Sequence, residues 1–458
     1  MSKTFISFLG AIPYHNTQYY WQPNRADLSI PMPYVQEAII RNCLSNWSEA
    51  DKIFVFTTEE AKRNNYDNRI ISFDRTTNTP KIQESNGLNR VLEKLRLEGI
   101  IHHFEPVIIP NGYTEQEIFQ VFQQIFERIE PSSEVYFDIT VGFRSLPMLG
   151  IVLLNYAKNV IDAEVKAIYY GNYEAGRAEK EKQVNSAKYK QLSEEEITNI
   201  QHSIVQAPIL NLISLSILQD WTSAAREFIK LGKADSLAAL VKDNQPKLGE
   251  ELLQFEQAIT TCRGALLSQD LDINSLKNIL SKIKNEPIKE QLKPLITRIE
   301  AKIDRFKNGK TLQNGFAAVE WCIQHNMIQQ GITFLQETLI SHVLEKVERK
   351  EKLKDLFFRE ITATALQLIT AKRNRHFGPK FQQRPIPEQE DILEVYEDMR
   401  AYVKSQAPLK SLYAELIGHD GFRNDINHCG FRENYQLPNQ LRESLKDLFI
   451  KISDLNLQ

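Results

Sequence analysis

The chain has 458 residues, more than one ordinary hydrophobic core accommodates, so two or three domains are expected. Hydrophobic residues make up 42% and charged residues 25%, as in soluble globular proteins, and no apolar run is long enough to cross a bilayer. The formal net charge of −3 excludes a protein that is basic all over, but it permits a local basic site because steering depends on where charges lie.

The first residues, MSKTFISFLGAIPYHN, contain one lysine and a short apolar run that no small-residue cleavage site follows. We interpret them as a first strand and not as a signal peptide. No pair of cysteines has metal-ligand or redox spacing, which indicates a reducing, cytoplasmic setting. The four cysteines are Cys43, Cys262, Cys322 and Cys429.

Residues 1–175 alternate between strand-like and helix-like segments. Amphipathic stretches such as 35–47 and 114–130 separate short runs rich in Ile, Val, Phe and Tyr. Nearly continuous apolar strands separated by helices indicate a parallel sheet covered on both faces. The sequence therefore predicts an α/β domain of Rossmann-like build, with strands in residues 4–10, 52–58, 103–110, 134–140 and 165–171.

The sequence changes character near Gly176. Residues 174–196 are charged and poor in large apolar side chains, which is typical of a connector or an exposed hairpin. The remainder is predicted to be helical to the end of the chain, and one buried stripe at helical spacing is formed by Ile328, Ile332, Leu335, Leu339 and Val343. We expect three parts: a sensor-like α/β domain in 1–175, a connector and helical insertion in 176–300, and an all-α domain in 301–458.

A ligand site is expected at the strand ends, because open parallel sheets bind ligands beyond the carboxyl ends of their strands. Polar or small residues follow almost every predicted strand. The candidate binding residues are Gly10, Ala11, Ile12, Pro13, Tyr14, Thr57, Thr58, Thr140, Gly142, Phe143, Arg144 and Ser145.

The segment DITVGFRSLPMLG is the most informative of these ends. A helix that starts near Leu146 would present unpaired N–H groups to an anion, and Gly142 allows close backbone approach. Arg144 adds a guanidinium fork suited to phosphate. The alternative is a simple strand-to-helix turn in which Ser145 only caps the helix. The first strand is not followed by GxGxxG, and no P-loop is present, which argues against a dehydrogenase or an ATPase.

The segment DGFRNDINHCG, residues 420–430, carries a candidate catalytic pair. Positions five apart on a regular helix are separated by about 140°, so Arg423 and His428 converge only if the Asp420–Gly421 turn leaves Arg423 at a frayed helix start. His428 could then move the proton of a ribose hydroxyl while Arg423 holds a phosphate, which would cleave RNA without a metal. The alternative is two ordinary polar residues at a helix start.

Two other polar clusters carry weaker signals. His102 and His103 lack carboxylate or cysteine neighbours, so no metal site is expected there. A basic segment, which we interpret as a solvated charge run or as support for an RNA backbone, contains Lys372, Arg373, Arg375, His376, Lys380 and Arg384.

In combination, these features resemble the CRISPR-associated CARF–HEPN ribonucleases of type III CRISPR systems. Residues 140–147 are similar to the family's Thr-x-Gly-x-Arg-x-x-Pro-like turn, and residues 56–61 look like its second-strand end. Residues 317–337 resemble the helix pair that opens the HEPN domain, and RNDINH matches its R-x4-6-H signature. Val141 stands where many relatives carry His, and residues 200–300 match no part of the family that we identify.

The resemblance implies a function for each half. In that family, CARF domains of a homodimer bind a cyclic oligoadenylate, and paired HEPN domains then cleave single-stranded RNA in a shared site, without a metal or other cofactor and leaving a cyclic phosphate. By analogy, Arg423 contacts the scissile phosphate, His428 transfers a proton or positions the ribose, and Asn424 orients them. The ring size of the activator, four or six, and the base preference stay open.

Two other hypotheses compete with this ligand-gated ribonuclease. The chain could be a sensor whose inactive helical domain regulates a partner; a DNA-reading variant would need a basic recognition helix, which the helical half does not show. Alternatively, the sensor domain could also degrade its activator, with Thr57, Thr58 and Thr140 positioning a ribose hydroxyl.

Overall fold

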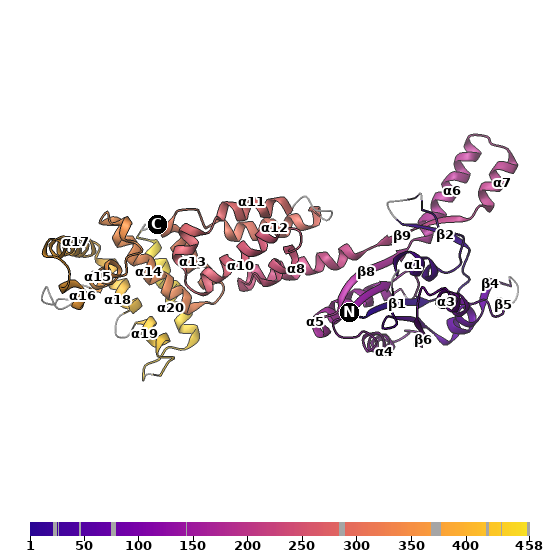
Figure 1. The fold of residues 1–458 in the computed structure, drawn as a ribbon, viewed down its shortest axis with the longest axis horizontal. Coiled ribbons are helices and arrows are strands. Elements are labelled where there is room, and N and C mark those ends of the chain that lie inside the picture. The colour runs from indigo at the N-terminus through magenta and orange to yellow at the C-terminus, as the bar shows by residue number, and fades with distance from the viewer. Residues whose placement is uncertain are drawn as a thin grey trace. The chain divides into compact units, whose positions relative to one another are not determined.

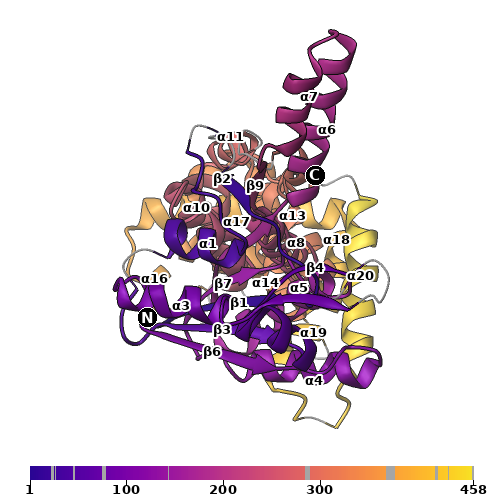
Figure 2. The same cartoon turned by 90° about the vertical axis from the view of Figure 1, so that its right-hand side faces the viewer.

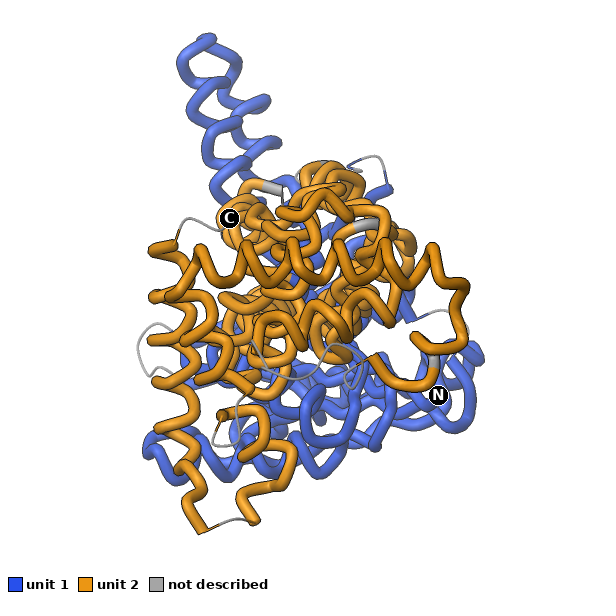
Figure 3. Tube along the Cα trace, turned by 90° about the vertical axis from the view of Figure 1, so that its left-hand side faces the viewer, with its two compact units in different colours: residues 1–217 blue, residues 218–458 orange. Residues whose placement is uncertain are grey.

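The structure is a computed structural model in which contacts divide the chain into two compact units, residues 1–217 and 218–458 (Figure 3). The boundary falls within helix α8, and it differs from the expected boundaries near residues 175 and 300. The described residues are 1–21, 25, 27–44, 47–74, 79–142, 144–283, 289–367, 377–417, 421–431 and 433–455. Among them, no helix combines the length and apolar character that a membrane span needs.

A seven-stranded sheet forms the centre of the first unit (Figure 1). Its order is β2-β9-β8-β7-β1-β3-β6, and every neighbouring pair is parallel except β8 with β9. The strands are β1 Lys3–Leu9, β2 Thr17–Trp21, β3 Lys52–Thr57, β6 His103–Ile108, β7 Glu134–Asp138, β8 Glu164–Gly171 and β9 Val205–Asn211, and a separate hairpin pairs β4 Arg69–Phe73 with β5 Pro80–Gln83. The five expected strands and the Rossmann-like α/β build are confirmed.

Helices cover both faces of this sheet, which explains why its strands read as continuous apolar runs. Neighbouring residues of one strand enter different cores: Phe5 packs with helices α1 and α3, whereas Ile6 packs with helices α4 and α5. The helices of these layers are α1 Val35–Cys43, α3 Leu88–Leu97, α4 Glu115–Phe126 and α5 Leu146–Ile161, and a short α2 Glu59–Ala61 with η1 Lys62–Asp67 follows β3.

The charged segment after β8 is an exposed helical hairpin, as one of the two sequence interpretations held. Helix α6 (Tyr173–Tyr189) and helix α7 (Glu194–His202) pack on each other and project from the sheet (Figure 2). The expectation of helix from there to the end of the chain is wrong at β9, which joins the sheet between β2 and β8. Its apolar run is short, and a short run does not distinguish a strand from a buried helix turn.

The second unit is helical around one continuous hydrophobic core. The expected stripe is confirmed, because Ile332, Leu335, Leu339 and Val343 are buried and Ile328 is half-buried. The elements are α8 Ile213–Leu231, α9 Asp235–Val241, α10 Pro246–Thr260, η2 Leu266–Asp270, α11 Ile273–Ile283, α12 Lys289–Ile303, α13 Thr311–Gln324, α14 Ile328–Lys346, η3 Lys350–Lys352, α15 Leu356–Gln367, α16 Gly378–Gln382, α17 Ile386–Ser405, α18 Ala407–Ile417, α19 Phe422–Asn427 and α20 Pro438–Ser453.

Candidate functional sites

The first candidate site lies where four parallel strands end together. Strands β8, β7, β1 and β3 are neighbours in that order, so their carboxyl ends meet at one edge of the sheet. The chain passes from β1 to β3 on one side and returns to β7 on the other, which makes this edge a topological switch point. The structure therefore brings the predicted residues of the strand ends to one side of the first unit.

Asp138 is the hub of this edge. Its Oδ2 accepts a hydrogen bond from the Ser7 hydroxyl at 2.7 Å, and its Oδ1 accepts from the Thr140 hydroxyl at 2.6 Å and the Thr140 N–H at 2.9 Å. The Gly171 N–H in turn donates to Thr140 Oγ1 at 2.7 Å. Burial raises the pKa of Asp138, although the hydrogen bonds from Thr140 and Ser7 oppose the shift. One carboxyl group thus connects β1, β7 and β8.

Helix α1 extends this network through Gln36. The Gln36 amide donates to Ser7 Oγ at 3.2 Å and to the Phe8 carbonyl at 2.9 Å, and the side chain is fully buried. Its Oε1 has no hydrogen-bond partner among the described residues. The position of the β1 end is consequently fixed from the helix layer as well as from the sheet.

The loop after β1 is held in place from two directions. The Gly10 N–H donates to Tyr14 Oη at 2.9 Å, and the buried Asn65 donates to the carbonyls of Gly10 and Ile12, both at 2.8 Å. Ala11 and Pro13 are half-buried, whereas the Ile12 side chain is 67% exposed. The loop therefore presents Ile12 on a fixed backbone.

The turn after β7 requires glycine at position 142. Gly142 has φ 143°, a backbone region that side chains disfavour, and a Cβ there would lie 2.5 Å from Leu146 Cδ2. Arg144 is exposed. Ser145 takes the N-cap position of α5, but its side chain makes no capping hydrogen bond, so the structure does not bear out the simple capping interpretation. Phe143 lies outside the described residues.

The threonine hydroxyls of this site are engaged within the chain. Thr57 is completely buried and donates to the Thr58 carbonyl at 3.1 Å, so the structure does not bring it to a ligand surface. Thr58 is the N-cap of α2, and its Oγ1 accepts from the Ala61 N–H at 3.2 Å. With Thr140 bonded as above, these hydroxyls give no support to the hypothesis that they position a ribose.

Sequence reasoning missed the supporting residues of this site. Asp138, Ser7, Gln36 and Asn65 were not singled out, yet each holds a strand end or loop in place. A signal existed for Asp138, which is a carboxylate at the end of an otherwise apolar strand. Asn65 gave none, because it lies in a polar segment.

The second candidate site is the short helix α19. Gly421 is its N-cap, Arg423 is its second residue and His428 is its C-cap, and both side chains are exposed. The helix begins at Phe422, so Arg423 lies within its first turn, and Asp420 lies outside the described residues. Regular helical spacing therefore leaves Arg423 and His428 about 140° apart around the axis.

Helix α19 ends in a Schellman motif. The Gly430 N–H donates to the Asp425 carbonyl at 3.0 Å and the Cys429 N–H to the Ile426 carbonyl at 2.9 Å, with Cys429 in the left-handed conformation. The buried carboxylate of Asp425 also accepts from the Gln436 N–H at 2.8 Å. Both the helix end and the loop that follows are thereby fixed. The half-buried Asn424 donates its N–H to the Gly421 carbonyl at 3.1 Å.

The surroundings of α19 contain a second arginine with a different role. Burial raises the pKa of Tyr413 on α18, and the charges of Arg423 and Arg359 partly oppose that rise, so both guanidinium groups lie near this phenol. Arg359 makes five hydrogen bonds, to Glu337, Ser341 and Leu353, which use all its N–H groups. Arg359 is therefore structural, whereas Arg423 reaches solvent.

The remaining predicted features are only partly described. Lys372, Arg373, Arg375 and His376 of the basic segment, and the Lys380 side chain, lie outside the described residues. Arg384 pairs with Glu388 and lies over the Phe357 ring. Within the described residues, no group of three His, Cys, Asp or Glu side chains is placed to hold a metal ion.

The structure defines a class of protein in which a Rossmann-like sheet with a polar switch point precedes a helical unit. Residues 4–174 match the family model for the CARF domain of the CRISPR system endoribonuclease Csx1, and residues 217–314 match that for the second domain of the CRISPR-associated protein MJ1674. The N-terminal α/β unit is accordingly a CARF domain, and part of the helical unit is similar to a CRISPR-associated protein.

Two individual proteins are similar to this chain. The CRISPR-associated protein MJ1674 of Methanocaldococcus jannaschii is 22% identical over 192 residues, which cover 41% of this chain and 24% of that protein. The structure of Enterococcus italicus Csm6 bound to cyclic hexa-2′-fluoro-hexa-dAMP aligns with 100% of this chain and 95% of that chain, at 12% identity and a TM-score of 0.40. The second family model covers much of the segment for which the sequence had shown no likeness.

Proposed function

We propose that the chain is a metal-independent single-stranded RNA endoribonuclease of CRISPR antiviral defence, activated when its first unit binds a cyclic oligoadenylate. The observation that carries the proposal is α19: it exposes Arg423 and His428 on a helix whose buried residues are fully anchored, within a protein that also carries a CARF domain.

The ligand half of the proposal is supported by the edge that Asp138 organises. Its exposed groups are Arg144, the open backbone at Gly142 and the side chain of Ile12. A cyclic oligoadenylate presents phosphates and flat bases. The phosphates suit a guanidinium and the unpaired N–H groups of a helix start, and the bases suit an apolar side chain. The buried network holds these groups in place before the ligand arrives, which lowers the cost of binding.

The nuclease half follows from proton transfer near neutral pH. The 2′-oxygen of the substrate attacks phosphorus, the bond to the 5′-oxygen breaks, and the 2′-proton is lost as the 5′-oxygen gains one. His428 is the group that moves a proton, and Arg423 neutralises the charge that builds on the phosphate. The products carry a 2′,3′-cyclic phosphate and a 5′-hydroxyl.

The angular separation of Arg423 and His428 favours a site built from two copies of the chain. In a two-fold dimer, the arginine of one copy can face the histidine of the other, so the pair need not converge within one helix. The exposed apolar face of α5 supports self-association, because it shows side chains that a monomer would leave in water: Met148, Ile151, Val152, Tyr156 and Val160. Helix α5 starts directly after the Arg144 turn, so ligand contacts lie next to this face.

The test is cleavage of a labelled single-stranded RNA in EDTA. Wild type and His428→Ala are each incubated with cyclic tetra-adenylate, with cyclic hexa-adenylate and with no ligand. We expect cleavage by the wild type with one ring, in the presence of EDTA, and at least about a hundredfold loss in His428→Ala. His202→Ala is a matched control, since that exposed histidine lies on α7. Ligand binding without cleavage would instead indicate a sensor that regulates a partner.

A further inference from the structure

The chain reverses immediately after His428. Cys429 and Gly430 both have positive φ, 54° and 72°, and the Phe431 N–H donates to the His428 carbonyl at 2.9 Å. A hydrogen bond between residues three apart closes a tight turn with its end Cα atoms less than about 7 Å apart. Phe431 is therefore an immediate neighbour of the candidate catalytic histidine.

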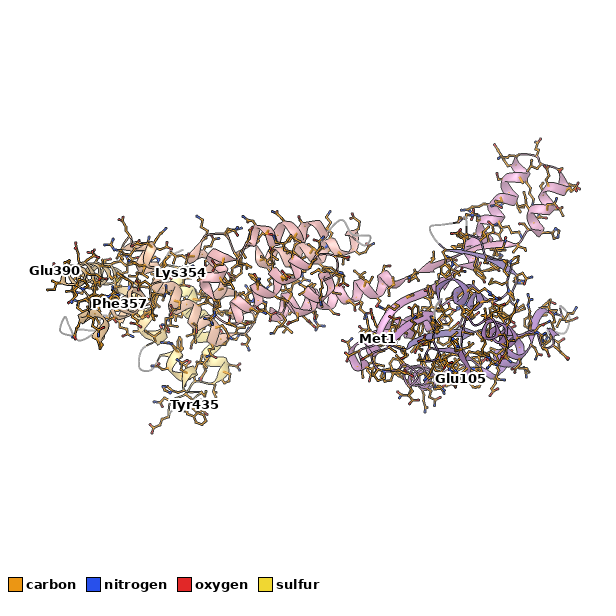
Figure 4. All side chains as sticks on the ribbon, in the orientation of Figure 1. Met1, Glu105, Lys354, Phe357, Glu390 and Tyr435 are labelled. Carbon is orange, nitrogen blue, oxygen red and sulfur yellow. The ribbon has the colours of Figure 1, made fainter. Side chains whose placement is uncertain are left out.

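Two aromatic side chains of this loop face solvent. Phe431 is 91% exposed and Tyr435 is 57% exposed. A Cβ built on Gly430 would lie 3.7 Å from the Tyr435 Cβ, so the base of the tyrosine packs against the same turn. Tyr435 is labelled in Figure 4. Exposure of a whole phenylalanine to water is unfavourable, and two such rings beside one catalytic candidate indicate a binding surface.

The loop between these rings is anchored at its far end. Asp425 accepts from the Gln436 N–H, and the Leu437 N–H donates to Gln440 Oε1 at 2.8 Å, where α20 begins. The backbone on both sides of the aromatics is thus fixed by α19 and α20. Anchors on both sides of the two aromatic residues limit the conformational entropy that they lose when a ligand stacks on them.

We propose that Phe431 and Tyr435 form a stacking platform for the bases of single-stranded RNA next to the scissile phosphate; this inference rests on the proposed ribonuclease function. Phe431 follows His428 by one tight turn, so the platform and the candidate catalytic histidine lie within the reach of one or two nucleotides. Every base offers a π-face, so stacking holds RNA without reading its sequence.

The chemistry of the loop favours RNA over a second copy of the chain as the occupant. Arg432, Glu433 and Asn434 separate the two rings in sequence, and Glu433 and Asn434 are exposed, unlike the continuous apolar face of α5. A protein interface is built around a core depleted in charged residues, whereas stacking needs only isolated aromatic faces.

The first test measures RNA binding without cleavage. A fluorescein-labelled single-stranded RNA is titrated into His428→Ala protein that carries in addition Phe431→Ala, Tyr435→Ala, Phe431→Trp or Tyr189→Ala. We expect Phe431→Ala to weaken RNA binding about tenfold. Phe431→Trp should keep the affinity of the parent protein, since any large aromatic ring can stack on a base. Tyr189→Ala is the matched control, because that tyrosine is 90% exposed at the end of α6.

The second test changes the RNA and leaves the protein folded as it is. A backbone of the same length that lacks bases should bind His428→Ala protein about tenfold more weakly than RNA, and Phe431→Ala should bind that backbone no more weakly. Equal affinity for both nucleic acids overturns the platform. So does a change of Phe431→Ala from dimer to monomer in sedimentation velocity, which would place the ring in an interface between copies.

The two proposals fail in different ways. If Phe431→Ala cleaves and binds RNA like the wild type while His428→Ala does not cleave, the platform is overturned and the ribonuclease stands. If the wild type binds RNA through Phe431 but never cleaves it, the ribonuclease is overturned, and with it the placement of the rings beside a scissile phosphate, while their contact with RNA is established. Absence of RNA binding by the wild type overturns the platform.

Discussion

At the scale of single residues, the first unit depends on one buried carboxyl group. Asp138 receives three hydrogen bonds, and yet burial outweighs them and raises its pKa. The folded state therefore holds the Asp138 proton more tightly than the unfolded state, so stability falls as pH rises from the ordinary carboxyl pKa of about 3.9 towards the raised value.

This linkage predicts that the stability of the protein depends on pH through Asp138, and that Asp138→Asn removes this dependence. Compared with Asp138→Asn, the wild type should lose thermal stability between about pH 4 and the raised pKa, by at most about 1.4 kcal/mol per pH unit. Melting temperatures of both proteins across this range check the prediction. Asp162→Asn is the control, because that aspartate is exposed and its left-handed backbone suits asparagine. A wild type that gains stability with pH relative to Asp138→Asn would contradict the prediction.

The sequence predicted the exposed turn residues of this site better than its buried ones. Arg144 and Gly142 followed from a strand-to-helix turn, and the structure leaves both exposed at that turn. Thr57, predicted as a binding residue, is buried because the last position of a central strand still points into a core. Asn65 was out of reach, since its role depends on a carbonyl that lies 55 residues away in the chain.

At the scale of elements, periodicity was informative where runs were long. The five parallel strands and the buried stripe of α14 followed from their patterns, whereas β9 was missed because its place is given by pairing with β2 and β8. Helix α19 shows the opposite limit: its motif was visible, but its start depends on local backbone geometry. Neither the pairing partners of a strand nor the residue at which a short helix begins can be derived from hydrophobic periodicity in one sequence.

Helix α5 carries the next prediction. Val152 is 56% exposed on its apolar face, so Val152→Asp should leave the fold intact and weaken self-association by placing a charge in a buried interface. Sedimentation velocity should show more monomer, with RNA cleavage lost in proportion. Leu97→Asp is the matched control, because that leucine is 84% exposed at the end of α3, on the other face of the sheet. An unchanged dimer would remove α5 from the interface.

At the scale of the whole molecule, the proposed binding and cleavage residues belong to different units. Arg144 lies in residues 1–217, and α19 lies in residues 218–458. A ligand activates such a protein only if it binds one conformation better than another, and the coupling is a free energy that both sites share. A substitution in α19 should therefore abolish cleavage without affecting ligand binding, whereas a substitution in the ligand site should weaken both.

The separation can be measured with two substitutions. Arg144→Ala removes a charge-assisted phosphate contact, which is worth about 1.5–3 kcal/mol, so the affinity for the activating cyclic oligoadenylate should fall roughly 10- to 100-fold. Cleavage by Arg144→Ala should recover at high ligand concentration, because the effect is on affinity and α19 is intact. His428→Ala should bind the ligand like the wild type and stay inactive at every concentration. Calorimetric titration and RNA cleavage on the same preparations distinguish these outcomes. If Arg144→Ala stays inactive at saturating ligand, Arg144 transmits the signal in addition to binding the phosphate.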